Sequence, residues 1–122
     1  MNPAGTSQPE DAIPELESLQ EYFAARLPDR LRELEEAWNR VREAAWSAPD
    51  LKDFHRLVHS LVGAGATFGF PTLTAVSRAL ERRLSSVLHG AEPAPTAATV
   101  DELIVRLRQA AAEPAGAEER VT

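Results

Sequence analysis

Apolar residues recur at spacings of three and four along most of this chain, and that helical period constrains the fold more than any other feature of the sequence. Four or five successive segments carry such a stripe, and proline, glycine or short polar residues separate them. No stretch of useful length alternates apolar and polar residues in the way that a half-buried strand does. The sequence therefore predicts an all-α protein.

The breaks between the stripes place the expected helices. Pro14 suits a first helical turn, and Pro28 either kinks this first helix or starts the next one. Gly69 stands where a C-terminal cap glycine belongs, shortly before Pro71 in the first turn of the following helix. Residues 99–102 have the pattern of a capping box that opens the last helix. The expected helical segments are 14–27, 31–45, 51–68, 71–87 and 99–110.

Short connections between amphipathic helices favour antiparallel neighbours. We expect an antiparallel up-down four-helix bundle, with the segment near residues 14–27 as an additional N-terminal helix or a kinked extension. The length suits one bundle domain, at residues 13–112. Residues 1–12 and 113–122 are polar and contain proline and glycine, so we expect them to be disordered.

The charge and the composition exclude several classes of function. A formal net charge of −6 disfavours binding to nucleic acid, because an acidic surface repels phosphate backbones. The chain has no apolar run long enough to span a membrane, and its first residues lack the pattern of a secretory signal. The absence of cysteine excludes disulfides and thiol chemistry. We expect a cytoplasmic protein, and the initiator methionine favours a free-standing one over an excised domain.

The third segment carries the residues that bear most on function. With Leu61 at the centre of the buried face, six residues of the segment fall within about 60° of it: Phe54, Leu57, Val58, Ala64, Gly65 and Phe68. His59 falls roughly 160° away, on the solvent side. Such an exposed histidine is either incidental or reactive. The same outer face is expected to carry Lys52, His55, Arg56, Gly63 and Ala66.

The surface beside His59 is expected to be bare. Side chains on a helix lean toward its N-terminus, so the residue four positions later would cover His59, and that residue is Gly63. Ser60 and Ala66 are also small. Because glycine in a helix costs roughly 1 kcal/mol against alanine, an outward Gly63 indicates clearance for a docking partner. Gly65 lies on the core face, where we expect it to permit close helix packing.

A histidine side chain is a suitable carrier for a phosphoryl group. Its ordinary pKa lies near neutrality, so a neutral, nucleophilic nitrogen is available. Covalent transfer through that nitrogen divides one phosphoryl transfer into two easier steps.

The third segment resembles the signature of the histidine-phosphotransfer (HPt) family. The signature is a histidine followed by leucine two residues on, glycine four residues on, small residues, and glycine ten residues on. It is carried here by the stretch His59-Ser60-Leu61-Val62-Gly63-Ala64-Gly65-Ala66-Thr67-Phe68-Gly69. Weaker similarity upstream at residues 23–31, and downstream at Leu73 and the Leu80-Glu81 pair, extends the resemblance over roughly residues 15–110.

The resemblance implies a four-helix bundle with the phosphoryl-accepting histidine, here His59, exposed in the middle of a helix. It implies phosphoryl exchange with the aspartate of a response-regulator receiver domain, or a hybrid histidine kinase as partner. The receiver would bring Mg²⁺, and the chain itself would need no cofactor. Neither a kinase nor a hydrolase site is expected, and the family makes a monomer the default. The docking surface around His59 is predicted to comprise Lys52, His55, Arg56, Ser60, Val62, Gly63 and Ala66.

One position departs from the family pattern. The family usually has a lysine three residues after the histidine, where this chain has Val62. Arg56 precedes His59 on the outer face, but its side chain should lean away from the histidine. Arg78 or Arg82 on the following helix are candidates to replace the lysine.

Two alternatives to a phosphoryl carrier remain. One is a metal-binding helical bundle, because His55 and His59 are spaced i, i+4, although His89 is distant and a third ligand would have to be Asp or Glu. The other is a helical adaptor with a degenerate HPt fold, which binds a signalling partner without phosphotransfer. The missing lysine favours this second alternative.

Overall fold

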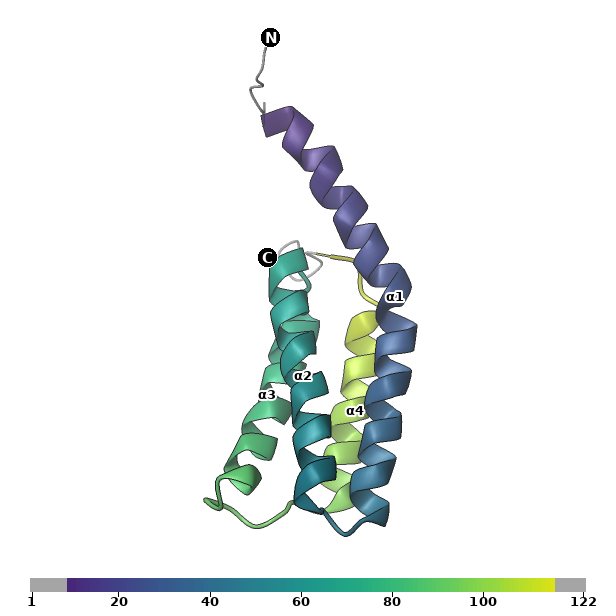
Figure 1. Cartoon of the computed structure of the whole chain (residues 1–122). Helices are drawn as coiled ribbons and strands as arrows, with labels where there is room; N and C mark the ends of the chain where they lie inside the picture. Colours follow the sequence, from purple (N-terminus) through teal and green to yellow (C-terminus); the bar gives the residue numbers. More distant parts are fainter. Residues whose placement is uncertain (1–8, 116–122) are drawn as a thin grey trace.

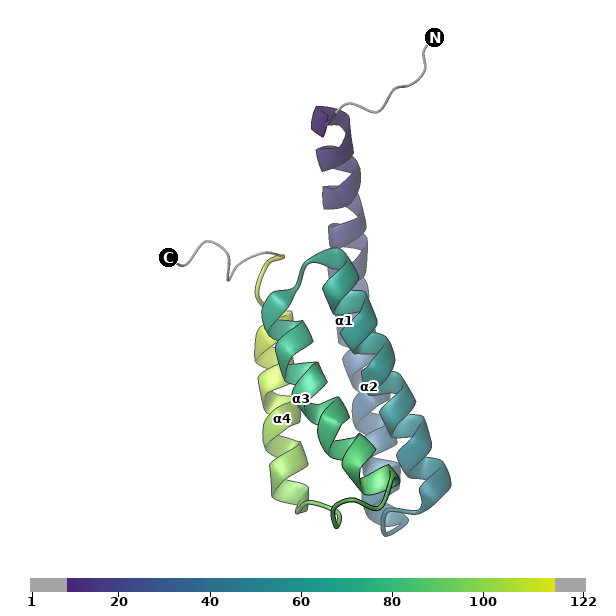
Figure 2. The same cartoon turned by 90° about the vertical axis from the view of Figure 1, so that its left-hand side faces the viewer.

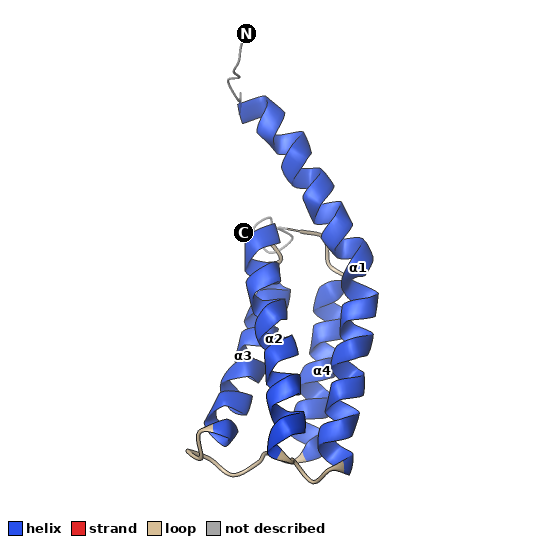
Figure 3. Cartoon of the chain, in the orientation of Figure 1, coloured by secondary structure: helices blue, strands red, loops and turns tan. Residues whose placement is uncertain are grey.

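Four α-helices make up most of residues 9–115, the part of the chain that the computed structural model describes, and that part contains no strand (Figure 3). The helices are α1 (Pro9–Glu43), α2 (Ala48–Phe68), α3 (Pro71–Leu88) and α4 (Ala97–Ala111). Successive helices run in opposite directions and lie side by side as an up-down bundle (Figures 1 and 2). The predicted fold class, an antiparallel four-helix bundle, is confirmed.

Helix α1 forms both the first bundle helix and an N-terminal extension beyond it (Figure 1). The helix is continuous through Pro28, so the kinked extension is the correct one of the two predicted arrangements. A proline inside a helix removes one backbone hydrogen bond and displaces a carbonyl, which accounts for the change of direction along α1 in Figure 1.

The helix α1 begins earlier than the sequence predicts. Residues 9–12, which we expected to be disordered, already belong to it, whereas residues 1–8 and 116–122 lie outside the described residues. Pro9 suits a first helical turn, and the acidic Glu10 and Asp11 that follow it favour a helix N-terminus.

The aromatic residues Phe23, Phe68 and Phe70 hold α1 against the turn between α2 and α3. The ring centroid of Phe23 lies 5.2 Å from those of both Phe68 and Phe70. One turn earlier, the Gln20 side-chain amide donates a hydrogen bond of 2.9 Å to the Phe68 carbonyl. Leu16 and Leu19 precede these contacts on α1 and are exposed. The apolar stripe predicted for residues 14–27 is therefore buried only in part.

The observed helix caps agree with the prediction at the end of α2 and differ from it at the start of α4. Gly69 has a φ of +79° and ends α2 as a left-handed cap, as predicted. The predicted start of α4 is wrong by three residues: the cap is Thr96, whose hydroxyl accepts a hydrogen bond of 3.3 Å from the Thr99 amide. Thr99, the predicted cap, instead lies in the first turn of α4.

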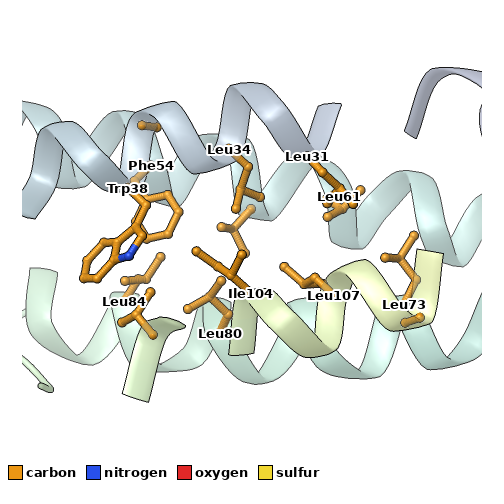
Figure 4. Packing of buried hydrophobic residues seen from close by; sticks show 14 of the residues in the cluster. Leu31, Leu34, Trp38, Phe54, Leu61, Leu73, Leu80, Leu84, Ile104 and Leu107 are labelled. Carbon is orange, nitrogen blue, oxygen red and sulfur yellow. The ribbon is translucent and has the colours of Figure 1, made fainter. Parts of the chain in front are cut away.

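Apolar side chains from all four helices form one core (Figure 4). The Trp38 ring of α1 stacks on Phe54 of α2, with 5.6 Å between centroids. The Trp38 indole also donates a hydrogen bond of 2.8 Å to Asp101 of α4. The other labelled core residues in Figure 4 are Leu31, Leu34, Leu61, Leu73, Leu80, Leu84, Ile104 and Leu107.

The buried face of α2 is turned toward α3 relative to the prediction. Its buried residues are Leu51, Phe54, Val58, Leu61, Val62 and Gly65. Around the helix these residues centre about 50° from Leu61, on the side of Val58 and Gly65. Leu57, Ala64 and Phe68, which lie on the other side of Leu61, are only partly buried.

The close approach of α2 and α3 at Gly65 explains this rotation. A Cβ atom added at Gly65 would lie 2.7 Å from Thr74 Oγ1 and 3.6 Å from the Thr74 amide nitrogen. The predicted packing role of Gly65 is therefore confirmed. Because α3 lies so near, the neighbouring edge of α2 is covered as well, and that edge includes Val62.

Candidate functional site

His59 lies near the middle of α2, and its side chain is 71% exposed. The solvent-facing position predicted from the helical period is therefore confirmed. The rotation of α2 nevertheless brings His59 nearer to α3 than predicted, at about 110° from the centre of the buried face. This position lets His59 make a side-chain contact with the neighbouring helix while most of the ring stays in solvent.

That contact joins His59 to Glu81 of α3. The Nδ1 atom of His59 is hydrogen-bonded to the Glu81 carboxylate, whose side chain is 19% exposed. A carboxylate only accepts hydrogen bonds, so the proton of this bond belongs to Nδ1. In the neutral ring the other nitrogen, Nε2, then carries a free lone pair. Glu81 thus selects the tautomer and orients the ring.

His55 is a second histidine one turn before His59, but its environment is different. It is half-buried, and its Nε2 atom is hydrogen-bonded to the Ser85 hydroxyl of α3 at 2.9 Å. Its ring is nearly parallel to that of His59, at 10°, with 6.4 Å between centroids. Burial lowers the pKa of His55 below its ordinary value, Glu81 opposes this shift, and His59 and His89 add to it. His55 is therefore a neutral, anchored neighbour of the more exposed His59.

The lowered pKa of His55 predicts how folding depends on pH. As pH falls below the ordinary histidine value of 6.5, the unfolded chain takes up a proton at residue 55 before the folded chain does. The stability that His55 contributes is therefore present above 6.5 and is lost as pH falls through the folded pKa. Chemical unfolding should show a shallower loss of stability between pH 7 and 5 in His55→Gln than in the parent. Equal pH slopes in the two proteins would contradict this.

Most of the predicted docking surface is exposed. Lys52, Arg56, Ser60, Gly63 and Ala66 all lie on the solvent side of α2, and His55 is half-buried beside them. A Cβ atom added at Gly63 would meet nothing within 4 Å, so the space over His59 is open.

Val62 is the exception to the predicted docking surface. We expected it in the docking surface around His59, but it is only 7% exposed. The prediction is wrong because it placed the core centre at Leu61, whereas the approach of α3 moved that centre toward Val62. A partner that docks on α2 does not reach this side chain.

Glu81 and Ser85 were absent from the predicted site. Both belong to α3, one turn apart, and each meets one of the two histidines of α2. The sequence signal that could have identified them is their i, i+4 spacing on α3. It matches the i, i+4 spacing of His55 and His59 on α2, which runs antiparallel to α3. The sequence did not show which edge of α3 faces α2.

The arrangement of the histidines bears on the metal-site alternative. One nitrogen of His55 is engaged by Ser85, and one nitrogen of His59 is engaged by Glu81. Among the side chains that the structure describes, those of residues 15–115, no cluster of three or more histidines, aspartates or glutamates is arranged to hold a metal ion. Across the same residues, no helix is long and apolar enough to cross a membrane.

We compared the chain with models of known protein families, with curated proteins and with solved structures. The family model described as the Hpt domain matches residues 18–113, which span nearly all of the bundle and include His59 and Glu81. A search of curated proteins and a search of solved structures each gave no match. Hpt domains are helical phosphotransfer-carrier modules of two-component signalling rather than a family of catalytic enzymes. The match covers well over half of the sequence, and the chain therefore belongs to the Hpt domain family.

Proposed function

We propose that this chain carries a phosphoryl group on Nε2 of His59 and exchanges it with the aspartate of a response-regulator receiver domain. The observation that supports this most is the exposed His59 ring, held through Nδ1 by Glu81 beside the open surface at Gly63. A nucleophile fixed in one tautomer and left accessible meets the main requirement of phosphoryl transfer, which is positioning.

The proposed transfer of the phosphoryl group from the receiver aspartate to His59 needs no further reactant. The Nε2 lone pair attacks the phosphorus of the aspartyl phosphate, the P–N bond forms, and the P–O bond breaks with its electrons passing to the aspartate carboxylate. The proton on Nδ1 stays in place, so the phosphorylated ring becomes an imidazolium. Glu81 lies against that proton and stabilises the new positive charge. Transfer to a second receiver reverses these steps.

The partner supplies what the chain lacks. Receiver-bound Mg²⁺ neutralises charge on the phosphoryl oxygens during transfer, and this chain needs no cofactor of its own. Lys52, together with Arg56 and its partner Asp53, lies on the exposed face of α2 on the N-terminal side of His59, so this face carries some positive charge although the chain as a whole is acidic. That local charge suits an approaching phosphorylated, negatively charged receiver site. We place this exchange in the cytoplasm, with the chain acting as a monomer.

Incubation with phosphorylated receivers from the same cell tests the proposal. In the presence of Mg²⁺, we expect label to leave at least one receiver and to appear on this chain as a base-stable, acid-labile phosphate. Unphosphorylated receiver is the control. If receivers bind the chain but none transfers phosphate, the degenerate adaptor is the correct alternative and the carrier proposal fails.

A further inference from the structure

We propose that Arg78 of α3 is a positioning residue for the phosphoryl group on His59, and that it supplies the positive charge that Val62 cannot supply from α2. This inference rests on the proposed function, because it concerns the same phosphorylated nitrogen. The need for such a charge follows from the site itself. Phosphorylation adds a dianion to His59, and its nearest charged neighbour is the carboxylate of Glu81, which has the same sign.

Cross-helix contacts fix which residue of α3 lies opposite Val62. His55 meets Ser85, His59 meets Glu81, and Gly65 lies against Thr74. In an antiparallel pair, each step forward on α2 is a step backward on α3. The position on α3 that lies level with Val62 is therefore Arg78, between Glu81 and Thr74.

Arg78 also lies on the correct edge of α3. Thr74, Arg78, Glu81 and Ser85 are spaced four, three and four residues apart, so they form one stripe along the helix. Three members of this stripe meet α2, and Arg78 is the fourth. Residues three apart on a helix have Cβ atoms about 5–6 Å from each other, so Arg78 neighbours Glu81 directly. Its side chain is exposed and can follow a group bound to His59.

Other cations are placed less well. Arg56 pairs with Asp53 at 3.4 Å, so its charge is already engaged. Arg82 is rotated about 100° from Glu81, out of the stripe that faces α2. Among the ion pairs of the described side chains, residues 15–115, none involves Arg78, so its charge is available.

The buried Val62 complements this arrangement. A lysine at position 62 would place a second positive charge level with Arg78 across the interface of α2 and α3, and the two like charges would repel. With Val62 covered at 7% exposure, Arg78 is the one cation at this level of the pair in the described structure. In this arrangement α3, through Arg78, supplies the positive charge that a lysine at position 62 would supply from α2.

Chemical phosphorylation separates this inference from the proposed function. Phosphoramidate phosphorylates histidine without a protein partner, so the phospho-form can be prepared whether or not a receiver transfers to it. The variants are Arg78→Gln, Arg78→Lys and, as the matched control, Arg82→Gln. The measurements are the ³¹P NMR titration of the phosphohistidine, its hydrolysis half-life, and the melting temperature of each protein.

We expect Arg78→Gln to raise the phosphoryl pKa, because a nearby cation favours the dianion, while Arg78→Lys and Arg82→Gln stay close to the parent. Where a receiver transfers phosphate, Arg78→Gln should slow transfer about tenfold, the effect of losing one charge-assisted hydrogen bond. An unchanged ³¹P titration in Arg78→Gln, or an equal shift in Arg82→Gln, would overturn the inference. A shifted titration without transfer from any receiver would instead support the role of Arg78 and count against the proposed exchange.

Discussion

Replacing His59 by glutamine is expected to abolish phosphoryl labelling of the chain, whereas replacing His55 by glutamine is expected to leave it. Glutamine lacks the free ring nitrogen that forms the P–N bond, so no partial activity should remain. His55 also has two ring nitrogens, but its Nε2 atom is held by Ser85 and its side chain is half-buried. Accessibility and the free lone pair, rather than the presence of a histidine, decide which residue is labelled.

The measurement is label transferred from a phosphorylated receiver after separation of the two proteins. Because the His59 side chain is 71% exposed, His59→Gln should keep the helical circular dichroism and the melting temperature of the parent. Label that survives in His59→Gln would refute the assignment of His59. Loss of label in His55→Gln, without loss of fold, would show that the neighbouring ring takes part in the transfer.

The second large effect concerns Gly63, which lies over His59 on the open side of α2. Glutamine at position 63 should lean toward the N-terminus of α2 and occupy the space that a receiver must enter. Displacing the reacting groups by even a small distance costs about a hundredfold in rate, so we expect phosphotransfer to Gly63→Gln to fall by about that factor. The melting temperature should hold, because a Cβ atom at this position would meet nothing within 4 Å and the rest of the side chain can lie on the solvent-exposed surface.

Gly65 provides the matched control two residues later in the same helix. Alanine at position 65 would place its Cβ 2.7 Å from the hydroxyl of Thr74, which is buried and hydrogen-bonded to the Phe70 carbonyl. Overpacking of this kind costs about 1–3 kcal/mol, more than the roughly 1 kcal/mol that helical alanine gains over glycine. Gly65→Ala should therefore melt earlier than the parent, while Gly63→Ala should melt at the same temperature or later.

Paired measurements of melting temperature and transfer rate on these variants separate docking from stability. If Gly63→Gln melts much earlier than the parent, Gly63 is a packing residue. If it transfers phosphate at the parental rate, the receiver does not approach over Gly63 and the docking surface lies elsewhere around His59. A Gly65→Ala variant as stable as the parent would show that α3 can move away from α2 at little cost.

The local periodicity of apolar residues was sufficient to predict the helices of the bundle and the exposure of His59. The apolar stripes placed the bundle helices, and Gly69 and Pro71 marked the end of α2 and the start of α3, because these signals depend only on near neighbours in the chain. The outward position of His59 followed from the same argument. An angle of about 160° from the expected core centre leaves room for a large error before the residue becomes buried.

Only the tertiary structure determined that Val62 is buried and that Glu81 contacts His59. Val62 stood near the border of the predicted core face, where a rotation of about 50° changes an exposed residue into a buried one. The close approach of α3 at Gly65 and Thr74 sets that rotation. The pairing of His59 with Glu81 needs, in addition, the antiparallel register of two helices. A helical period gives angles around one helix, and it carries no information on which neighbour lies closest or at what level the two helices meet.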